Sequence, residues 1–208
     1  MTTAILIPVE RPARIMAIAN EIAATVHPLT PVLWACTEGS ECAAILEFWR
    51  EDFTCDEGGS WGVRLNRLFT HTDAEYLFLG ADDVRFHPGW HDAAMARMQQ
   101  VDGVVAVNDL WNPRGTLALV SRRYLLEEGG TVDGTGAIIH EGYRHCFSET
   151  ELFETAASRS RFAYCAESIV EHLHPAAGKS EWDEVYKIGT DNWDHDEALY
   201  LSRRHLWA

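Results

Sequence analysis

Short apolar runs separated by segments of helical periodicity constrain the fold of this chain more than any other feature. Four runs of five or six mostly apolar residues are too short for helices and suit strands that are buried on both faces. They are residues 4–9, 32–37, 76–80 and 103–108. After the first run, Pro12 suits the first turn of a helix, and apolar side chains recur at helical spacing from Ile15 to Val26. This alternation predicts an α/β fold with a mostly parallel sheet flanked by helices.

The rest of the chain divides into weaker elements and loops. We expect a glycine-rich loop at 56–62 and an irregular loop at 129–145 that is long enough to bind a ligand. Ser148 and Glu151 have the spacing of a capping box, which would open a helix ending near Ser158. Further helices are expected at 61–70, 88–100 and 122–128, and further strands at 116–120, 161–166 and 168–174. We predict one domain over residues 1–178, with a helical or irregular extension, 179–208, packed on it.

Charge and cysteine usage exclude several classes of protein. The 208 residues include 17 Lys and Arg against 32 Asp and Glu, a formal net charge of −15. This balance disfavours a nucleic-acid-binding surface, because such a surface needs a basic footprint. The five cysteines are scattered without a C-x-x-C pair, which predicts reduced thiols and no disulfide frame or zinc site. With no signal-peptide pattern and no apolar run of membrane-spanning length, the sequence predicts a cytoplasmic protein.

The strand expected at 76–80 is followed by two adjacent carboxylates, Asp82 and Asp83. Open α/β sheets bind ligands in the crevice beyond the carboxyl ends of their strands. Two carboxylates in that position need a cation, and an oxygen-rich site suits Mg²⁺ or Mn²⁺ bridging to phosphate. The alternative is an acidic turn that merely follows a strand.

Four histidines are candidates for the same region. His172 and His174 lie two residues apart on an expected strand, so both should point to one face. On the spacing alone, the favoured interpretation is a pair of half-exposed histidines on an edge strand. His140 and His145 belong to the long irregular loop, and their spacing matches no metal motif. We assign them to contacts with an acceptor substrate.

Further candidate contacts lie near the glycine-rich loop. Arg64 and Asn66 follow it, and a guanidinium suits phosphate, although a solvated helix face explains Arg64 about equally well. Trp61, Trp90 and Trp111 can stack on a sugar or a base. Large aromatic residues more often belong to the core, and we assign Trp90 to it.

Five segments, in this order, resemble the GT-A nucleotide-sugar glycosyltransferases, in particular the family-two-like group, over residues 4–175. They are IPVERP (7–12), GGSWGVRLNRLF (58–69), FLGADDVRFHPGW (78–90), FSETEL (147–152) and SIVEHLHP (168–175). The third segment is similar to the metal-binding D-x-D segment of that family. It departs from the pattern, because a D-x-D at 80–82 has Gly80 for its first Asp and one at 81–83 has Ala81.

The resemblance implies a GT-A fold, with a Rossmann-like sheet and a smaller acceptor-side sheet and loop region. It implies a hexosyltransferase-type enzyme that uses Mn²⁺ or Mg²⁺ and moves a sugar, with inversion, from a UDP-sugar to an acceptor. The acceptor stays open between a glycan, a protein and a modified nucleic acid base. The implied nucleotide contacts are Pro8, Glu10, Asp56, Arg64, Asn66, Ala81 and Asp82. The implied metal ligands are Asp82, Asp83, His172 and His174, and the implied catalytic base is Glu149.

The base assignment and the function both have alternatives. Glu149 follows the expected N-cap Ser148, where a helix N-terminus favours an ionised carboxylate; alternatively, Glu149 and Glu151 only decorate the helix start. A nucleotidyltransferase that makes nucleotide sugars is a second possible function, although VERPAR (9–14) lacks the glycines that it would need. A catalytically silent sugar- or nucleotide-binding module and a metallohydrolase using the histidines and the Asp pair are the others.

Overall fold

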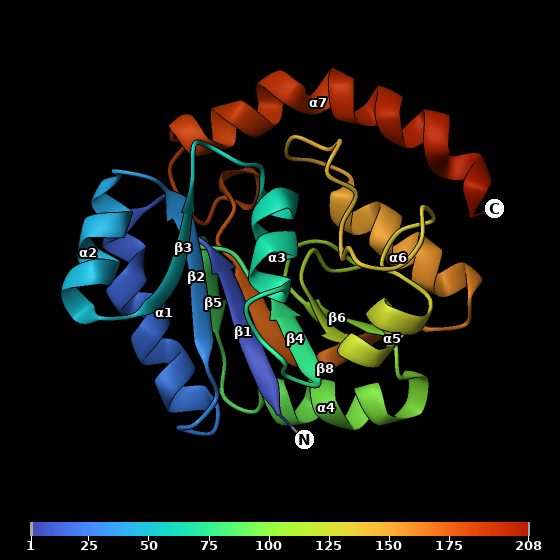
Figure 1. Ribbon diagram of the computed structural model, residues 1–208, viewed down its shortest axis with the longest axis horizontal. Helices are drawn as coiled ribbons and strands as arrows, with labels where there is room; N and C mark the ends of the chain where they lie inside the picture. The colour runs from blue at the N-terminus through green and yellow to red at the C-terminus, as the bar shows by residue number, and fades with distance from the viewer. Residues whose placement is uncertain (1, 208) are drawn as a thin grey trace.

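An eight-stranded sheet runs through the part of the chain that the computed structural model describes, residues 2–207 (Figure 1). The strands are β1 (Thr3–Pro8), β2 (Val32–Thr37), β3 (Asp52–Asp56), β4 (Tyr76–Leu79), β5 (Val84–Phe86), β6 (Val104–Asn108), β7 (Ala118–Ser121) and β8 (Phe162–His172). Their order is β3-β2-β1-β4-β7-β6-β8-β5. Only β7 and β5 run against the other six strands. The carboxyl ends of those six strands therefore meet at one edge of the sheet.

Helices cover both faces of the sheet. They are α1 (Pro12–Thr25), α2 (Glu41–Trp49), α3 (Trp61–Phe69), α4 (Trp90–Val101), α5 (Arg122–Glu127), α6 (Ser148–Ser158) and α7 (Glu184–Arg203). α1, α2 and α4 share one apolar cluster with Ile5 and Ile7 of β1. α3, α5 and α6 share a second cluster with Ala4 and Leu6. Alternate residues of one fully buried strand thus supply both cores, which is the pattern expected of a central parallel strand.

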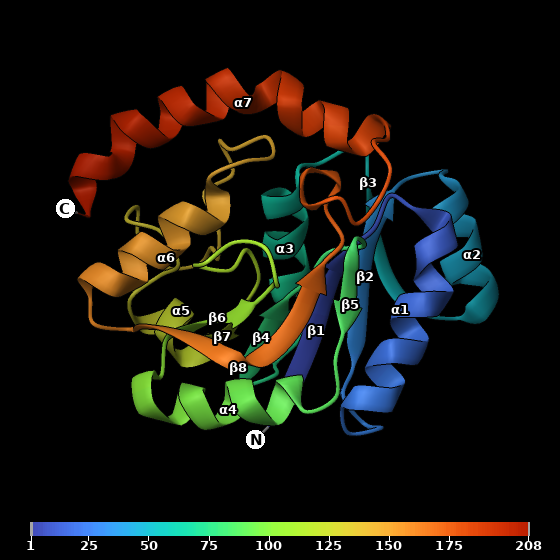
Figure 2. The same cartoon turned by 180° about the vertical axis from the view of Figure 1, so that it is seen from behind.

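α7 crosses the edge of the sheet at which the six strands end, as both views show (Figures 1 and 2). Near its start, the side chain of Asp183 caps the helix and pairs with Arg11, which follows β1. Near its end, Arg203 forms a salt bridge of 2.7 Å with Glu151 of α6. The C-terminal segment is therefore one long helix that joins the β1 side of the molecule to α6.

The sequence patterns miss two strands. β3 occupies 52–56, which overlaps the start of the expected loop at 56–62, and it was missed because it is a part-exposed edge strand with an Asp at each end. β5 has only three residues, too few to show a period, and it follows Asp83 directly. Both strands matter for function, because β3 ends at Asp56 and β5 pairs with the end of β8.

Two local predictions near the C-terminal half are wrong. The strands expected at 161–166 and 168–174 form one strand, β8, because a register shift beside Val107 and Asn108 accommodates the extra residues as a bulge. The capping box does not form either, because the N-cap is Phe147, in a left-handed conformation without a side-chain cap. Glu151 instead accepts a hydrogen bond from Tyr143 Oη at 2.7 Å.

The assignment of Trp90 to the core is confirmed. Trp90 is fully buried and packs against Phe78 and Phe86. All five cysteines are free. Within residues 2–207, no helix combines the length and the apolar character that crossing a bilayer requires.

Candidate functional site

Asp82 fixes the turn between β1 and α1. It is 5% exposed, and one carboxylate oxygen accepts hydrogen bonds from the backbone N–H groups of Glu10 and Arg11 at 2.7 and 2.8 Å. Its other oxygen pairs with the guanidinium of Arg11. Burial raises the pKa of Asp82, while the positive charge of Arg11 opposes the shift. Both oxygens are thus engaged by the protein itself, and Asp82 is less available to a metal than the sequence predicted.

Asp83 faces the end of β8. The register of β5 and β8 places Val84 opposite His172, and the Oδ2 atom of Asp83 lies 3.1 Å from His172 Nε2. The hydroxyl of Thr116 lies 3.2 Å from the other ring nitrogen and donates a hydrogen bond to buried Asp109. Burial alone would lower the pKa of His172, but the bond to Asp83 and its charge raise it. Burial alone would raise the pKa of Asp83, but the hydrogen bond and the charge of His172 lower it.

His174 does not share a strand face with His172, because β8 ends at His172. Its Nδ1 atom accepts a hydrogen bond from the backbone N–H of Ala176 at 3.1 Å. Its ring stacks on Trp111, with 4.5 Å between ring centroids, and meets the ring of Tyr186 edge-on at 5.0 Å. The two histidines are therefore not equivalent, contrary to what the sequence had suggested. His172 lies beside Asp83, and His174 packs between aromatic rings.

A second polar cluster lies at the ends of β1, β2 and β3. Buried Arg64, from α3, binds Asp56 through two guanidinium nitrogens at 3.1 Å and Glu10 at 2.6 Å. It also donates to the hydroxyl of Thr37 at 2.8 Å. Burial would raise the pKa of Asp56, but Arg64 and the backbone N–H groups of the glycine-rich loop lower it. Glu10 is the most exposed member, with 36% of its side chain accessible, and can contact a ligand.

Three other predicted nucleotide contacts have different surroundings. Pro8 ends β1 and Ala81 follows β4, so both lie at the same edge of the sheet. Asn66 points elsewhere: its amide accepts from the backbone N–H groups of Ile138 and Ile139 and donates to the carbonyl of Ile139. Asn66 is thus a loop anchor, because both ends of its amide are used, and the predicted nucleotide contact is not available to it.

Gly80 explains the incomplete D-x-D segment. A Cβ atom at this position would lie 2.5 Å from Cδ1 of Ile7 and 3.2 Å from the carbonyl oxygen of Leu6. Gly80 also accepts a hydrogen bond from the indole of Trp61 at 2.9 Å. An aspartate at position 80 would therefore require the buried side chain of Ile7 to move. Trp61 is engaged here by the protein rather than free to stack on a base.

Glu149 is the second residue of α6 and is half-buried. Burial raises its pKa, while the charge of His172 opposes the shift, so the two side chains lie within electrostatic reach. The sequence predicted that the helix N-terminus would keep this carboxylate readily ionised. Burial outweighs the helix terminus and raises the pKa of Glu149, and its role as a base stays a prediction.

The two loop histidines differ in their surroundings. His140 lies 3.7 Å from Asp133 and accepts a hydrogen bond from the backbone of Gly142, within its own loop. His145 packs against α7 at Gly189, one helical turn beyond Tyr186, which contacts Arg11. Only His145 is therefore close to the groups at the edge of the sheet.

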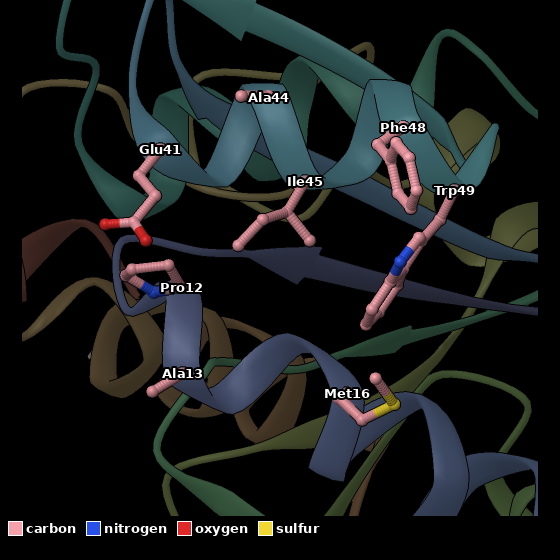
Figure 3. Close-up of a pocket in the computed structure, with 8 residues that line it drawn as sticks. All are labelled: Pro12, Ala13, Met16, Glu41, Ala44, Ile45, Phe48 and Trp49. Atoms are coloured by element: carbon pink, nitrogen blue, oxygen red, sulfur yellow. The ribbon is translucent and has the colours of Figure 1, made fainter.

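Two hollows flank these residues. A space of about 130 Å³ beside Asp83 is lined by Arg11, Arg14, Asp83, Leu173, Ser180, Glu181, Asp183 and Tyr186. A larger groove, about 480 Å³, separates α1 from α2 and is mostly apolar, with Glu41 its only charged side chain (Figure 3). The smaller space is lined by Arg11 and Arg14, which suit phosphate, but at about 130 Å³ it can take only part of a nucleotide.

The residues present provide part of a divalent metal site. Within residues 2–207, no three His, Cys, Asp or Glu side chains are grouped closely enough to hold an ion by themselves. Asp83 and His172 nevertheless offer a carboxylate oxygen and an imidazole nitrogen, and Thr116 fixes the ring, as outer-shell partners of metal ligands do. Mg²⁺ at nucleotide sites commonly takes few protein ligands and completes its shell with phosphate oxygens and water. The pair therefore fits an ion that arrives with a diphosphate.

The fold is that of the GT-A glycosyltransferases. It is similar to glucosyl-3-phosphoglycerate synthase from Mycobacterium tuberculosis in complex with Mn²⁺, UDP and glucosyl-3-phosphoglycerate, with a TM-score of 0.68, 12% identity and coverage of 97% of this chain and 79% of that one. It is also similar to the mannosyltransferase PcManGT from Pyrobaculum calidifontis in complex with GDP-Man and Mn²⁺. Here the TM-score is 0.63 and the identity 11%, over 85% of this chain and 58% of that one. For S. aureus TarS in complex with UDP, the TM-score is 0.61 and the identity 13%, over 82% of this chain and 59% of that one. This chain thus spans less than two thirds of the last two.

No family model matches the sequence, and no curated protein matches it. At 11–13% identity the likeness to solved structures establishes the fold, and the fold agrees with the predicted GT-A class.

Proposed function

We propose that the protein is a metal-dependent glycosyltransferase that moves a sugar from a nucleotide-sugar donor to an acceptor. The observation that carries this proposal is the meeting of Asp83 and His172, from distant parts of the chain, beside the Glu10–Arg64–Asp56 cluster at one edge of a GT-A sheet. The structural relatives crystallised with UDP or GDP-Man support a nucleoside diphosphate donor.

Each part of the site has a separate task in this proposal. Glu10 and the Asp56–Arg64 pair bind the nucleoside, with Glu10 accepting from ribose or base donors. Asp83 and His172 hold a divalent ion, Mn²⁺ or Mg²⁺, which supplies positive charge to the leaving diphosphate. Asp82 holds Arg11 in place, and its assignment as a metal ligand gives way to this structural role.

Glu149 is the proposed base. Its carboxylate accepts the proton of an acceptor hydroxyl as the acceptor oxygen bonds to the anomeric carbon of the sugar. The bond from that carbon to the diphosphate breaks, and the nucleoside diphosphate leaves with the electron pair. A single displacement of this kind inverts the anomeric centre. A pKa raised by burial brings the carboxyl group closer to working pH, where general bases are most effective.

The proposal is tested by thermal unfolding of the protein with UDP-, GDP- and ADP-sugars, each with and without Mn²⁺. Ligands that bind only the folded state raise its midpoint. We expect one nucleotide class to raise the midpoint, and to do so more strongly with Mn²⁺ than without it. No shift with any nucleotide sugar would contradict the proposal.

One observation favours a second candidate, a sugar-nucleotide-binding module without catalysis. Asp82 is locked to Arg11, and the D-x-D segment lacks its first carboxylate at Gly80. Such a module would bind the donor but release no nucleoside diphosphate from it over hours. Release that Mn²⁺ accelerates would exclude the module.

A further inference from the structure

The loop that carries His145 is fastened to α7 by one buried carboxylate. Asp196 is fully buried, and it accepts hydrogen bonds from the backbone N–H groups of Arg144, His145 and Cys146 at 3.0, 2.8 and 2.7 Å. Three successive backbone donors on one side chain leave this stretch little freedom. The position of His145 is therefore set by α7 and not by its own loop alone.

A glycine on the same helix makes room for the imidazole. A Cβ atom at Gly189 would lie 2.5 Å from Cδ2 and 2.8 Å from Nε2 of His145. Glycine in the middle of a helix is unfavourable relative to alanine, so a close contact is a physical reason for finding it there. One turn earlier, Tyr186 lies under the guanidinium of Arg11 and beside His174. The face of α7 that packs on His145 thus continues over the metal-binding edge.

The imidazole of His145 has unused hydrogen-bonding capacity. Its ring nitrogens have no hydrogen-bond partner among residues 2–207, although its backbone N–H is bonded to Asp196. Burial lowers the pKa of His145. The positive charges of Arg11 and His172 lower it further, and the negative charge of Asp83 opposes this shift. In its neutral form the ring carries one N–H donor. It packs against Gly189, one turn of α7 after Tyr186, and Tyr186 lines the hollow beside Asp83.

We propose that α7 completes the donor site, with Gly189 and Asp196 holding His145 beside the Asp83–His172 pair, where its imidazole donates a hydrogen bond to a diphosphate oxygen of the bound nucleotide. This role rests on the proposed function, because it requires a nucleoside diphosphate at this edge. It makes His145 a donor-binding residue and not the acceptor contact that the sequence suggested. Gly189 and Asp196 are positioning residues.

The first test compares diphosphates with monophosphates. Calorimetric titrations with UDP, GDP, UMP and GMP, all in Mg²⁺, are carried out on the parent, His145→Ala and His145→Gln. Loss of one hydrogen bond to a charged group should weaken the diphosphate about tenfold and leave the monophosphate unchanged. His145→Gln keeps an N–H donor and should restore part of the loss. His71→Ala is the control, because His71 is exposed beyond α3, at the opposite end of the sheet.

The second test asks whether Gly189 acts through His145. Gly189→Ala should weaken UDP or GDP by a similar factor, because the added methyl group displaces the ring. In a His145→Ala background the same change meets no ring, so it should cause no further loss of affinity. The double variant should also melt above His145→Ala alone, because alanine is the better helix former.

Three outcomes would overturn the inference. Equal diphosphate affinity in the parent and His145→Ala removes His145 from the donor site but leaves the proposed function standing. An undiminished effect of Gly189→Ala in the His145→Ala background refutes the positioning role of Gly189. A parent that binds neither UDP nor GDP, and whose unfolding midpoint no nucleotide sugar raises, overturns both this inference and the proposed function.

Discussion

Asp82 and Asp83 are adjacent in the sequence but have opposite environments. Asp82 is turned inward, where two backbone N–H groups and Arg11 consume both of its oxygens. Asp83 is turned toward His172, on a strand almost ninety residues later. A sequence pattern identifies the pair but cannot say which member faces the ligand, because that depends on Arg11 and on β5.

Replacing Asp82 tests its structural role. Asp82→Asn removes the charge from a buried ion pair and can accept fewer of its hydrogen bonds. Breaking such a pair typically costs several kcal/mol, so we expect the free energy of unfolding to fall by about 3 kcal/mol. Urea unfolding of the two proteins measures this. A variant as stable as the parent would show that the Asp82–Arg11 pair does not stabilise the fold.

Glu149 controls the rate at low pH if it is the base. The raised pKa keeps it protonated over a wider acid range than an ordinary glutamate, and only the ionised form accepts a proton. The rate of sugar transfer should therefore rise with pH through that pKa. Glu149→Gln should lose this pH dependence and lower the rate by roughly a hundredfold or more.

A matched control for Glu149 exists on the same helix. Glu154→Gln changes a carboxylate that is bonded to Tyr200, Trp207 and Arg114, away from His172. It should keep the pH profile of the parent. A loss under threefold in Glu149→Gln would remove Glu149 from the mechanism.

Among the elements, α7 contributes most that the sequence did not show. Its apolar side chains follow no clear helical stripe, and three of its largest are about half exposed: Ile188, Trp193 and Leu201. It is held by polar contacts at Asp183, Asp196 and Arg203. Isolated ring contacts of Tyr186, Trp193 and Tyr200 add to these. Apolar periodicity cannot detect a helix that docks in this way, so the sequence left residues 179–208 open between a helical and an irregular extension. The predicted domain boundary at 178 stays a prediction.

Asp196 is the contact on which the docking of α7 depends most. Asp196→Asn presents an amide N–H to backbone N–H groups, so at least one of them loses its acceptor. Leaving a buried donor unsatisfied costs about 1–3 kcal/mol, and we expect a loss of about 2 kcal/mol at pH 7.

The pH dependence of this effect has a definite sign. Burial would raise the pKa of Asp196, but its backbone hydrogen bonds lower it below that of an unfolded aspartate. Its contribution to stability is then complete above about pH 4 and lost as pH falls through the lowered pKa. Unfolding measured from pH 7 to pH 3 should show the parent and Asp196→Asn converging in acid. A constant difference would contradict this assignment.

For the whole molecule, the sequence predicted the class of the fold, and it placed its candidate residues at the edge of the sheet where several of them meet. Both follow from short apolar runs and from polar residues immediately after them, at Glu10, Asp82 and Asp83. It did not predict the order of the strands, because that order depends on pairing between distant segments. That pairing brings His172 to Asp83 and places Arg64 against Asp56.

The central claim is that Asp83 and His172 bind a divalent ion together with a nucleoside diphosphate. The most direct measurement is the affinity of the protein for UDP and GDP, by calorimetry, with Mn²⁺ and with a chelator, in the parent and in Asp83→Asn. Asp92→Asn, at an exposed carboxylate on α4, is the matched control. We predict that Mn²⁺ strengthens binding of one diphosphate by about tenfold or more in the parent and the control, and that Asp83→Asn abolishes this gain. Equal affinity with Mn²⁺ and with chelator in the parent, or a gain that survives in Asp83→Asn, would contradict the account.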